Sequence, residues 1–209
     1  MTCVFIEPRN DVEIREVIQR SQFFGIVRCA RDENSARVIL SGVGDRYRNA
    51  THICYAYRIG FPKITEFATD AGEPSGTAGR PILGAIQRTD LANTLVVIVR
   101  FFGGIKLGVR GLIEAYGFTA SEALRAAKRI ERKAALRCFL RLRYDQYSET
   151  LAILRRFGCI AEAPEYAEDI RFIALVPLDS VALLREFLDE RLARGLILEC
   201  YWGEDVSIL

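Results

Sequence analysis

Apolar residues recur along the first 133 positions of this chain with two different spacings. Alternating apolar and polar positions predict strands, whereas apolar positions three and four residues apart predict helices. Strands are expected at residues 4–7, 12–19, 23–30, 52–60 and 94–102, with a short one near Phe67. Helices are expected at residues 32–41, capped by Asp32, and at 81–88 and 111–133, with residues 43–50 as a polar connection. The run at 94–102 is too apolar to face solvent on both sides.

The remaining residues follow a simpler order of elements. Strands are expected at residues 136–144, 159–166, 170–177 and 196–202, and helices at residues 147–157 and 180–194. Asp179 is the expected N-cap of the last helix and Gly195 its end. The resulting βαββαβ order is that of the ferredoxin-like split βαβ unit. The pattern therefore predicts an α+β protein with an N-terminal domain of residues 1–133 and a ferredoxin-like C-terminal domain of residues 134–209.

Composition excludes disordered and membrane-spanning proteins. Half of the residues are apolar, so the chain can bury a core. The longest apolar run, residues 94–102, is far shorter than the roughly 20 residues that a bilayer-spanning helix needs. The start of the chain lacks the basic-then-apolar order of a signal peptide, so a cytoplasmic protein is expected.

The six cysteines are widely spaced and form no CxxC pair. A disulfide framework or a zinc site would normally bring cysteines closer together in the sequence. Most of these residues lie inside apolar runs, so we expect reduced, mostly buried thiols and no metal site. They are Cys3, Cys29, Cys54, Cys138, Cys159 and Cys200.

Two glycine-rich runs, each ahead of an expected helix, carry the most unusual chemistry. The first glycine run is residues 70–81, DAGEPSGTAGRP, and the second is residues 100–117, RFFGGIKLGVRGLIEAYG. Glycine lets a backbone approach a ligand closely, and the free amides of a helix N-terminus bind anions. We therefore expect phosphate or nucleic-acid binding, with tight turns alone, or a protein-binding surface, as alternatives. The residues expected to contact phosphate are Gly76, Thr77, Gly79, Arg80, Arg100, Gly103, Gly104, Lys106 and Arg110.

A weaker catalytic interpretation involves Asp70, Glu73 and His52, which is the only histidine. Such a trio could position a metal ion or move protons. Cys54 lies two residues after His52, on the same face of the expected strand, but nothing in the sequence supplies an orienting group for a thiol–imidazole pair. Aromatic residues near the glycine runs would stack on bases if they were exposed, although most are expected to lie in the core. They are Tyr55, Tyr57, Phe101, Phe102 and Tyr116.

The succession ATHICYAYRIG, DAGEPSGTAGRPIL and VVIVRFFGGIKLGVRGLIEAYG resembles the IMPACT family, in particular its bacterial YigZ-like members. The resemblance covers the whole chain. It implies an N-terminal domain like the second domain of a small-subunit ribosomal protein and like domain IV of elongation factor G, followed by the ferredoxin-like domain. It also implies a link with translation and nucleic acid, without an established reaction or a cofactor. The chain departs from the usual family pattern at Ala71, where a second aspartate is common, and at Arg110, where a glycine is common.

Three functional hypotheses follow. The first is a cytoplasmic protein that associates with RNA or the ribosome, or with a translation-related protein, and binds phosphate through the two glycine runs. Residues 1–133 carry six more basic than acidic residues, which favours this hypothesis, whereas residues 134–209 carry four more acidic ones. The second is a hydrolase that uses Asp70, Glu73 and His52, and the third is a protein-interaction module acting through the C-terminal domain.

Overall fold

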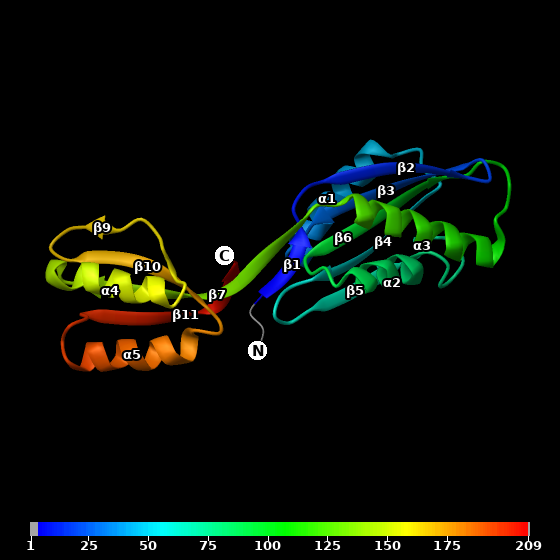
Figure 1. Cartoon of the computed structure of the whole chain (residues 1–209). Helices are drawn as coiled ribbons and strands as arrows, with labels where there is room; N and C mark the ends of the chain where they lie inside the picture. The colour runs from blue at the N-terminus through cyan, green and yellow to red at the C-terminus, as the bar shows by residue number, and fades with distance from the viewer. Residues whose placement is uncertain (1–3, 209) are drawn as a thin grey trace. The chain divides into compact units, whose positions relative to one another are not determined.

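The computed structural model describes residues 4–208. By their contacts these residues form two compact units: residues 6–131, here the first unit, and residues 132–208 with Val4 and Phe5, here the second unit. Each unit combines helices with antiparallel strands, so the chain is an α+β protein of two-domain character (Figure 1). The expected boundary after residue 133 lies inside strand β7 (Arg129–Leu142). As a limit between independently folding domains it stays a prediction.

A five-stranded antiparallel sheet forms the centre of the first unit. The register of β6 places Arg100 opposite Phe23 of β3 on one side and opposite His52 of β4 on the other. The central strand therefore brings the start of the second glycine run next to the histidine. In spatial order the strands are β2 (Val12–Ile18), β3 (Ser21–Cys29), β6 (Thr94–Phe101), β4 (His52–Ile59) and β5 (Thr65–Thr69).

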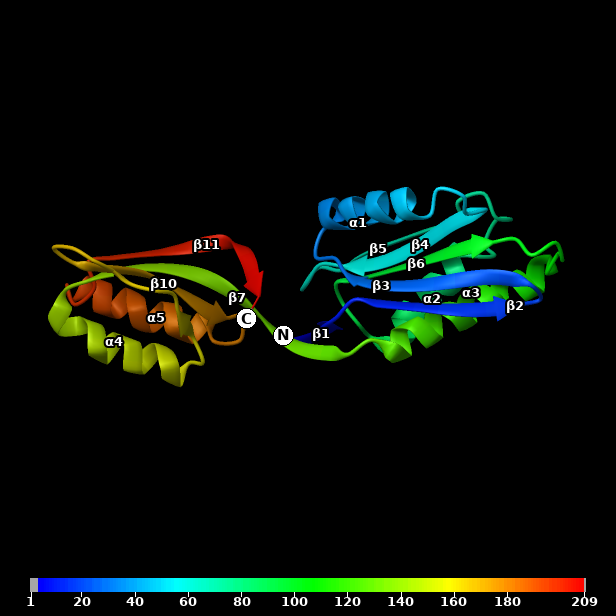
Figure 2. The same cartoon turned by 90° about the horizontal axis from the view of Figure 1, so that it is seen from above.

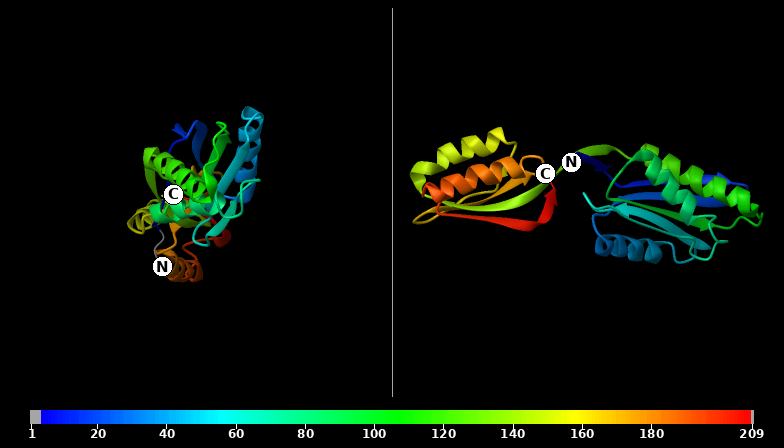
Figure 3. Two further views of the ribbon diagram at one scale, coloured as in Figure 1. Left: turned by 90° about the vertical axis from the view of Figure 1, so that its right-hand side faces the viewer. Right: turned by 90° about the horizontal axis from the view of Figure 1, so that it is seen from below.

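Helices cover both faces of this sheet (Figure 2 and Figure 3). Helices α2 (Gly79–Thr89) and α3 (Gly108–Ala126) pack on one face, and α1 (Glu33–Arg46) packs on the other. Residues of β6 alternate between two cores: Val96 and Ile98 pack under α2 and α3, whereas their neighbours pack under α1. Because both faces are covered, residues 94–100 are all buried, which confirms the expected buried strand.

Two expected helix ends in this unit are wrong. Helix α1 continues to Arg46 instead of ending near residue 41, because Val43 packs in the core and Arg46 binds both carboxylate oxygens of Glu13. Helix α3 ends at Ala126, and residues 129–133 belong to β7, which pairs with β1 (Val4–Pro8). Partners distant in the sequence thus override the local pattern. The expected N-cap is confirmed, because the Asp32 carboxylate accepts the Ser35 amide at 2.7 Å.

In the second unit, one sheet carries two helices on one face (Figure 2). Strand β7 lies between β11 and β10, and the short strands β8 and β9 pair with the other edge of β10. Leu140, Phe172, Leu184 and Leu188 are among the residues of the core between sheet and helices. After β7, the elements are α4 (Tyr144–Arg156), β8 (Ile160–Ala161), β9 (Glu165–Tyr166), β10 (Ile170–Pro177), α5 (Val181–Ala193) and β11 (Glu199–Ile208).

Several details of the second unit differ from expectation. The single strand expected at 159–166 is divided into β8 and β9, and the last strand begins at Glu199 instead of residue 196. The N-cap of α5 is Ser180, not Asp179, and the Ser180 hydroxyl donates to the Phe157 carbonyl at 3.1 Å. Cys54, Cys138 and Cys159 are buried thiols, as expected, whereas Cys3 lies outside the described residues.

Candidate functional site

The first glycine run folds back so that Asp70 caps helix α2. One carboxylate oxygen of Asp70 accepts the amides of Ala78 and Gly79 at 2.9 and 2.8 Å, and the other accepts the amide of Gly76 at 2.7 Å. Burial alone would raise the pKa of Asp70, but these three N–H donors outweigh it and hold the pKa below its usual range. A carboxylate of the chain itself therefore occupies the helix N-terminus that was expected to bind phosphate.

The other expected phosphate ligands of the first glycine run are also engaged or exposed. Thr77 is buried, and its hydroxyl donates to the Pro74 carbonyl at 2.6 Å. Arg80 is exposed and lies outside the pocket described below. Gly79 is required for packing, because a Cβ at this position would lie 2.8 Å from the backbone nitrogen of Thr69. This run is therefore built to join helix α2 to strand β5.

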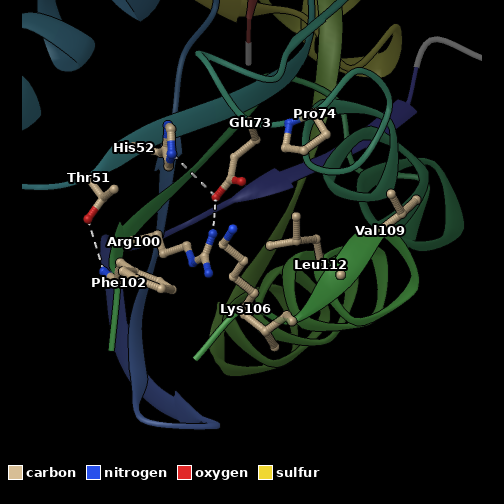
Figure 4. A pocket seen from close by; sticks show the side chains of 11 residues that line it. Thr51, His52, Glu73, Pro74, Arg100, Phe102, Lys106, Val109 and Leu112 are labelled. Carbon is tan, nitrogen blue, oxygen red and sulfur yellow. Dashed lines mark hydrogen bonds and ion pairs between the residues drawn. The ribbon is translucent and has the colours of Figure 1, made fainter. Parts of the chain in front are cut away.

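The second glycine run borders a pocket of about 330 Å3 (Figure 4). The pocket unites residues from the start of β4, the first glycine run, the end of β6 and the start of α3. In Figure 4, His52, Glu73, Arg100 and Lys106 point toward one another. The lining consists of Thr51, His52, Glu73, Pro74, Arg100, Phe102, Lys106, Leu107, Gly108, Val109 and Leu112.

A buried ion pair forms the floor of this pocket. Arg100 donates from Nη1 to Oε1 of Glu73 at 2.5 Å, and the two side chains are 6% and 3% exposed. The same Oε1 accepts the hydroxyl of Tyr116 at 2.8 Å. Desolvation raises the pKa of Tyr116 well above its usual value, so this group stays a phenol and donates. In the described chain, no hydrogen bond reaches Oε2 of Glu73.

The guanidinium of Arg100 retains unused donors. Its Nε is buried and has no hydrogen-bond partner, and among the described residues only Nη1 is bonded. The rings of Phe23 and Phe102 lie 5.5 and 5.6 Å from the guanidinium carbon and hold it by cation–π contacts. Because an unpaired buried donor is costly, this arginine is positioned to donate a further hydrogen bond to a ligand.

His52 faces the same ion pair. Its Nδ1 lies 3.1 Å from the carbonyl oxygen of Ala71, and a carbonyl only accepts, so Nδ1 carries a hydrogen. Nε2 lies 3.9 Å from Oε1 of Glu73. Nε2 is therefore the ring nitrogen on the pocket side, next to a carboxylate.

Cys54 is no nucleophile in this arrangement. Its thiol lies 2.9 Å from the carbonyl oxygen of Asp70 and 3.5 Å from the hydroxyl of Tyr116. Burial raises the pKa of Cys54 to about 12, so the reactive thiolate is absent at neutral pH. The thiol instead contacts the backbone of the first glycine run and does not line the pocket.

The N-terminus of α3 forms one wall of the pocket. The helix has no side-chain cap and no acidic residue in its first turn, and Leu107, Gly108 and Val109 line the pocket there. Lys106 precedes the helix and forms no ion pair with any described residue. Free amides, the positive end of the helix dipole and an unpaired ammonium group thus converge at this wall.

Of the expected site residues, the pocket brings together His52, Glu73, Arg100 and Lys106. Arg110 is 93% exposed and binds Glu114 one turn further along α3, outside the lining. Gly103 packs against the backbone of Arg20, and a Cβ there would lie 2.1 Å from a backbone atom. The residues of the expected set that do not line the pocket are Asp70, Gly76, Thr77, Gly79, Arg80, Gly103, Gly104 and Arg110.

Sequence reasoning missed the apolar wall and the tyrosine behind the ion pair. Leu107, Val109 and Leu112 are given no role by the sequence, and the expected helix begins only at residue 111, whereas α3 begins at Gly108. Tyr116 was assigned to the core, and its hydroxyl gave a signal, since a buried tyrosine usually finds a polar partner. That partner, Glu73, lies 43 positions away in the sequence.

Two further observations concern the described residues only. No group of three or more histidine, cysteine, aspartate or glutamate side chains in residues 4–208 is arranged to hold a metal ion. Within the same residues, no helix is both long and apolar enough to cross a membrane.

Comparison with known proteins places this site within a family. The Impact N-terminal domain matches residues 19–124, which include both glycine runs. The chain is 34% identical to the IMPACT family member YvyE of Bacillus subtilis, over 83% of this chain and 80% of that protein. It is 30% identical to YigZ of Escherichia coli, over 70% of this chain and 73% of that protein. A crystal structure of a hypothetical protein covers 98% of this chain with all of its own length, at 25% identity and a TM-score of 0.70. The chain therefore belongs to the IMPACT family.

Proposed function

We propose that the first unit binds a phosphate group of a nucleic acid in the pocket at the start of helix α3. One observation carries this proposal: Arg100 is buried in the pocket floor with a donor unpaired, opposite Lys106, which has no ion-pair partner. Two cations face a single carboxylate, Glu73, so the pocket has a net positive charge. The α3 N-terminus adds backbone donors of the kind that bind phosphate.

The two glycine runs have different roles in this function. The second run supplies the ligands, namely Arg100, Lys106 and the first amides of α3. The first run supplies Glu73, and its Asp70 holds the loop in place. Phosphate binding by Gly76 or Gly79 would require the Asp70 carboxylate to leave their amides.

A charge reversal at Lys106 tests this proposal. Lys106→Glu is expected to weaken binding of a single-stranded RNA oligonucleotide about tenfold or more, measured by fluorescence anisotropy. The slope of log affinity against log salt concentration is expected to fall by about 0.7 for the lost phosphate contact. Arg110→Glu is the matched control, since it makes the same charge change four residues later, outside the pocket. Equal losses in the two variants would contradict a specific pocket, and binding without salt dependence would contradict phosphate recognition.

A hydrolase is the second candidate, favoured by one observation. Nε2 of His52 faces the pocket 3.9 Å from Glu73, in the position that a general base would take. Asp70 is not part of this candidate, because its carboxylate serves the α2 N-terminus. Turnover of phosphate-ester or peptide substrates by the wild type, abolished in His52→Gln, would establish it. The absence of turnover on both substrate classes would exclude it.

We also propose finer assignments of the two folds, the partner and the cellular location, all of which the family resemblance suggests. The first unit resembles the second domain of a small-subunit ribosomal protein and domain IV of elongation factor G, and its sheet with helices on both faces supports this. The β11–β7–β10–β8 order supports a ferredoxin-like second unit. A role in translation, with RNA, the ribosome or a translation-related protein as partner, rests on family membership. The thiols of Cys54, Cys138, Cys159 and Cys200, which form no disulfide, support a reducing, cytoplasmic location.

A further inference from the structure

The pocket places an acceptor directly beside its cationic donors. Glu73 uses Oε1 for Arg100 and Tyr116, whereas Oε2 has no partner among the described residues although the side chain is 3% exposed. This oxygen is not one of the fully buried unpaired atoms, so it is reachable from the pocket that Glu73 lines and can accept a hydrogen bond from a ligand. A fully ionised phosphate group has only acceptors, so phosphate alone would leave this oxygen unsatisfied. The ligand therefore carries a donor in addition to its phosphate.

The short distance between Arg100 and Glu73 limits how far apart the anionic group and the hydrogen-bond donor of the ligand can lie. Arg100 and Glu73 are hydrogen-bonded to each other at 2.5 Å, so a donor on Oε2 and an anion on the guanidinium are near neighbours. In a ribonucleotide, the 2′-hydroxyl and a 3′-phosphate sit on adjacent carbons of the sugar. A 5′-phosphate is separated from both free hydroxyls by several more bonds. The vicinal arrangement fits the Arg100–Glu73 pair, and the 5′-phosphate does not.

The depth of the pocket favours a phosphate at the end of a nucleic-acid strand over a phosphate within the strand. Arg100 is 5% exposed, at the floor of a pocket of about 330 Å3, near the lower limit for small-molecule sites. An internal phosphodiester carries a sugar on both sides and does not reach such a floor. A terminal phosphate monoester is free on one side, and its extra charge suits Lys106 and the open α3 N-terminus.

The rim of the pocket offers a surface for a base. Phe102 lines the pocket and is 46% exposed, and Val109 across the pocket is 61% exposed. The Arg100 guanidinium lies on the Phe102 ring, which orients that ring at the entrance. Stacking on an exposed aromatic ring accepts any base, so this contact adds affinity without a strong sequence preference.

We propose that this pocket recognises a ribonucleoside 3′-monophosphate group, either free or at the 3′-end of an RNA strand. The phosphate binds Arg100, Lys106 and the first amides of α3; the 2′-hydroxyl donates to Oε2 of Glu73; and the base packs on Phe102. This inference rests on the proposed phosphate-binding function and adds the identity of the group that is bound.

Competition binding with matched ligands tests the proposal. A fluorescent RNA hexamer with a 3′-phosphate is displaced by hexamers that have a 3′-hydroxyl, a 5′-phosphate, or a 3′-phosphate on a 2′-deoxy terminal residue. The 3′-phosphorylated RNA is expected to bind about tenfold more tightly than the 3′-hydroxyl or 5′-phosphate forms. Loss of the terminal 2′-hydroxyl is expected to weaken binding about tenfold, as for a hydrogen bond to a charged group. Adenosine 3′-monophosphate as competitor distinguishes a free nucleotide from a strand end.

Two variants support the ligand series. Phe102→Leu removes the exposed ring and is expected to weaken nucleotide ligands about fivefold more than it weakens inorganic phosphate. Glu73→Gln is expected to abolish the preference for the 2′-hydroxyl; if this variant does not fold, the ribose and deoxyribose comparison in the wild type still decides. Equal binding of 3′-phosphate and 3′-hydroxyl RNA, still weakened by Lys106→Glu, would overturn the inference and leave the proposed function standing. The absence of binding by all phosphate ligands would overturn both.

Discussion

The two glycine runs look alike in sequence and differ in what their helices offer. Each has several glycines, an arginine and a helix that begins within or just after it. At α2 the terminal amides are bonded to Asp70, which lies eight and nine residues before two of the donors. At α3 there is no side-chain cap and no acidic residue in the first turn. The first helix terminus is satisfied within the chain, and the second is open to a ligand.

This difference shows that a glycine-rich stretch before a helix is not by itself an anion site. A helix N-terminus can bind an anionic ligand only if no carboxylate of the chain already accepts hydrogen bonds from its amides. Asp70 also fixes the loop that carries Glu73, so the closed terminus positions part of the floor of the open one. Substitutions can change one terminus toward the other, or separate the ion pair that joins the two runs.

The largest effect is expected from breaking the ion pair between the runs. Arg100→Met leaves the Glu73 carboxylate buried without its partner and is expected to lower the free energy of unfolding by about 3–5 kcal/mol. Urea denaturation measures this loss. Arg110→Met serves as control, because Arg110 pairs with Glu114 on the helix surface and its removal is expected to have a negligible effect. Similar stability of the two variants would show that the buried pair does not connect the runs energetically.

A smaller loss is expected from opening the closed terminus. Asp70→Asn removes the charge from three backbone hydrogen bonds and is expected to cost about 2 kcal/mol of stability. The freed amides then resemble those of α3, so added sulfate is expected to raise the melting temperature of this variant more than that of the wild type. An unchanged response to sulfate would contradict the idea that Asp70 takes the place of an anion.

The Asp70 carboxylate is also expected to make part of the free energy of unfolding sensitive to acid. Because its folded pKa lies below the unfolded value of about 3.9, its contribution is complete above that value. The contribution is lost as the pH falls from there through the folded pKa. Unfolding free energies at pH 7, 4 and 3 should therefore fall more steeply in the wild type than in Asp70→Asn. Asp32→Asn, which replaces the N-cap of α1 by another good cap, should retain the Asp70 contribution.

The smallest effect is expected from closing the open terminus. Val109→Asp places a carboxylate in the first turn of α3 at an exposed position. A charge that complements the helix dipole is expected to stabilise the protein by about 0.5 kcal/mol. The same charge should weaken binding of phosphate ligands, measured by isothermal titration calorimetry. A gain in stability without a loss of binding would place the ligand away from α3.

The strands were largely predictable because their pattern is local. The apolar residues of β6 indicated a central strand, and Asp32 indicated the start of α1. The end of α1 was not predictable, since it depends on Val43 finding the core and Arg46 finding Glu13 across the unit. The expected extension of α3 failed for the same reason, because residues 129–133 join β7, which pairs with β1 from the start of the chain.

The sequence by itself indicated the family, the α+β class, the two glycine runs and four residues that line the pocket. These features depend on composition, on local periodicity and on motifs that neighbouring residues share. Only the tertiary structure decided that Asp70 faces helix α2 and Glu73 faces Arg100. Those contacts arise because the first glycine run turns back on itself, so that Glu73 reaches Arg100, which the register of β6 places opposite His52. A hydrogen bond requires atoms within about 3 Å, and spacing along the chain does not determine that distance.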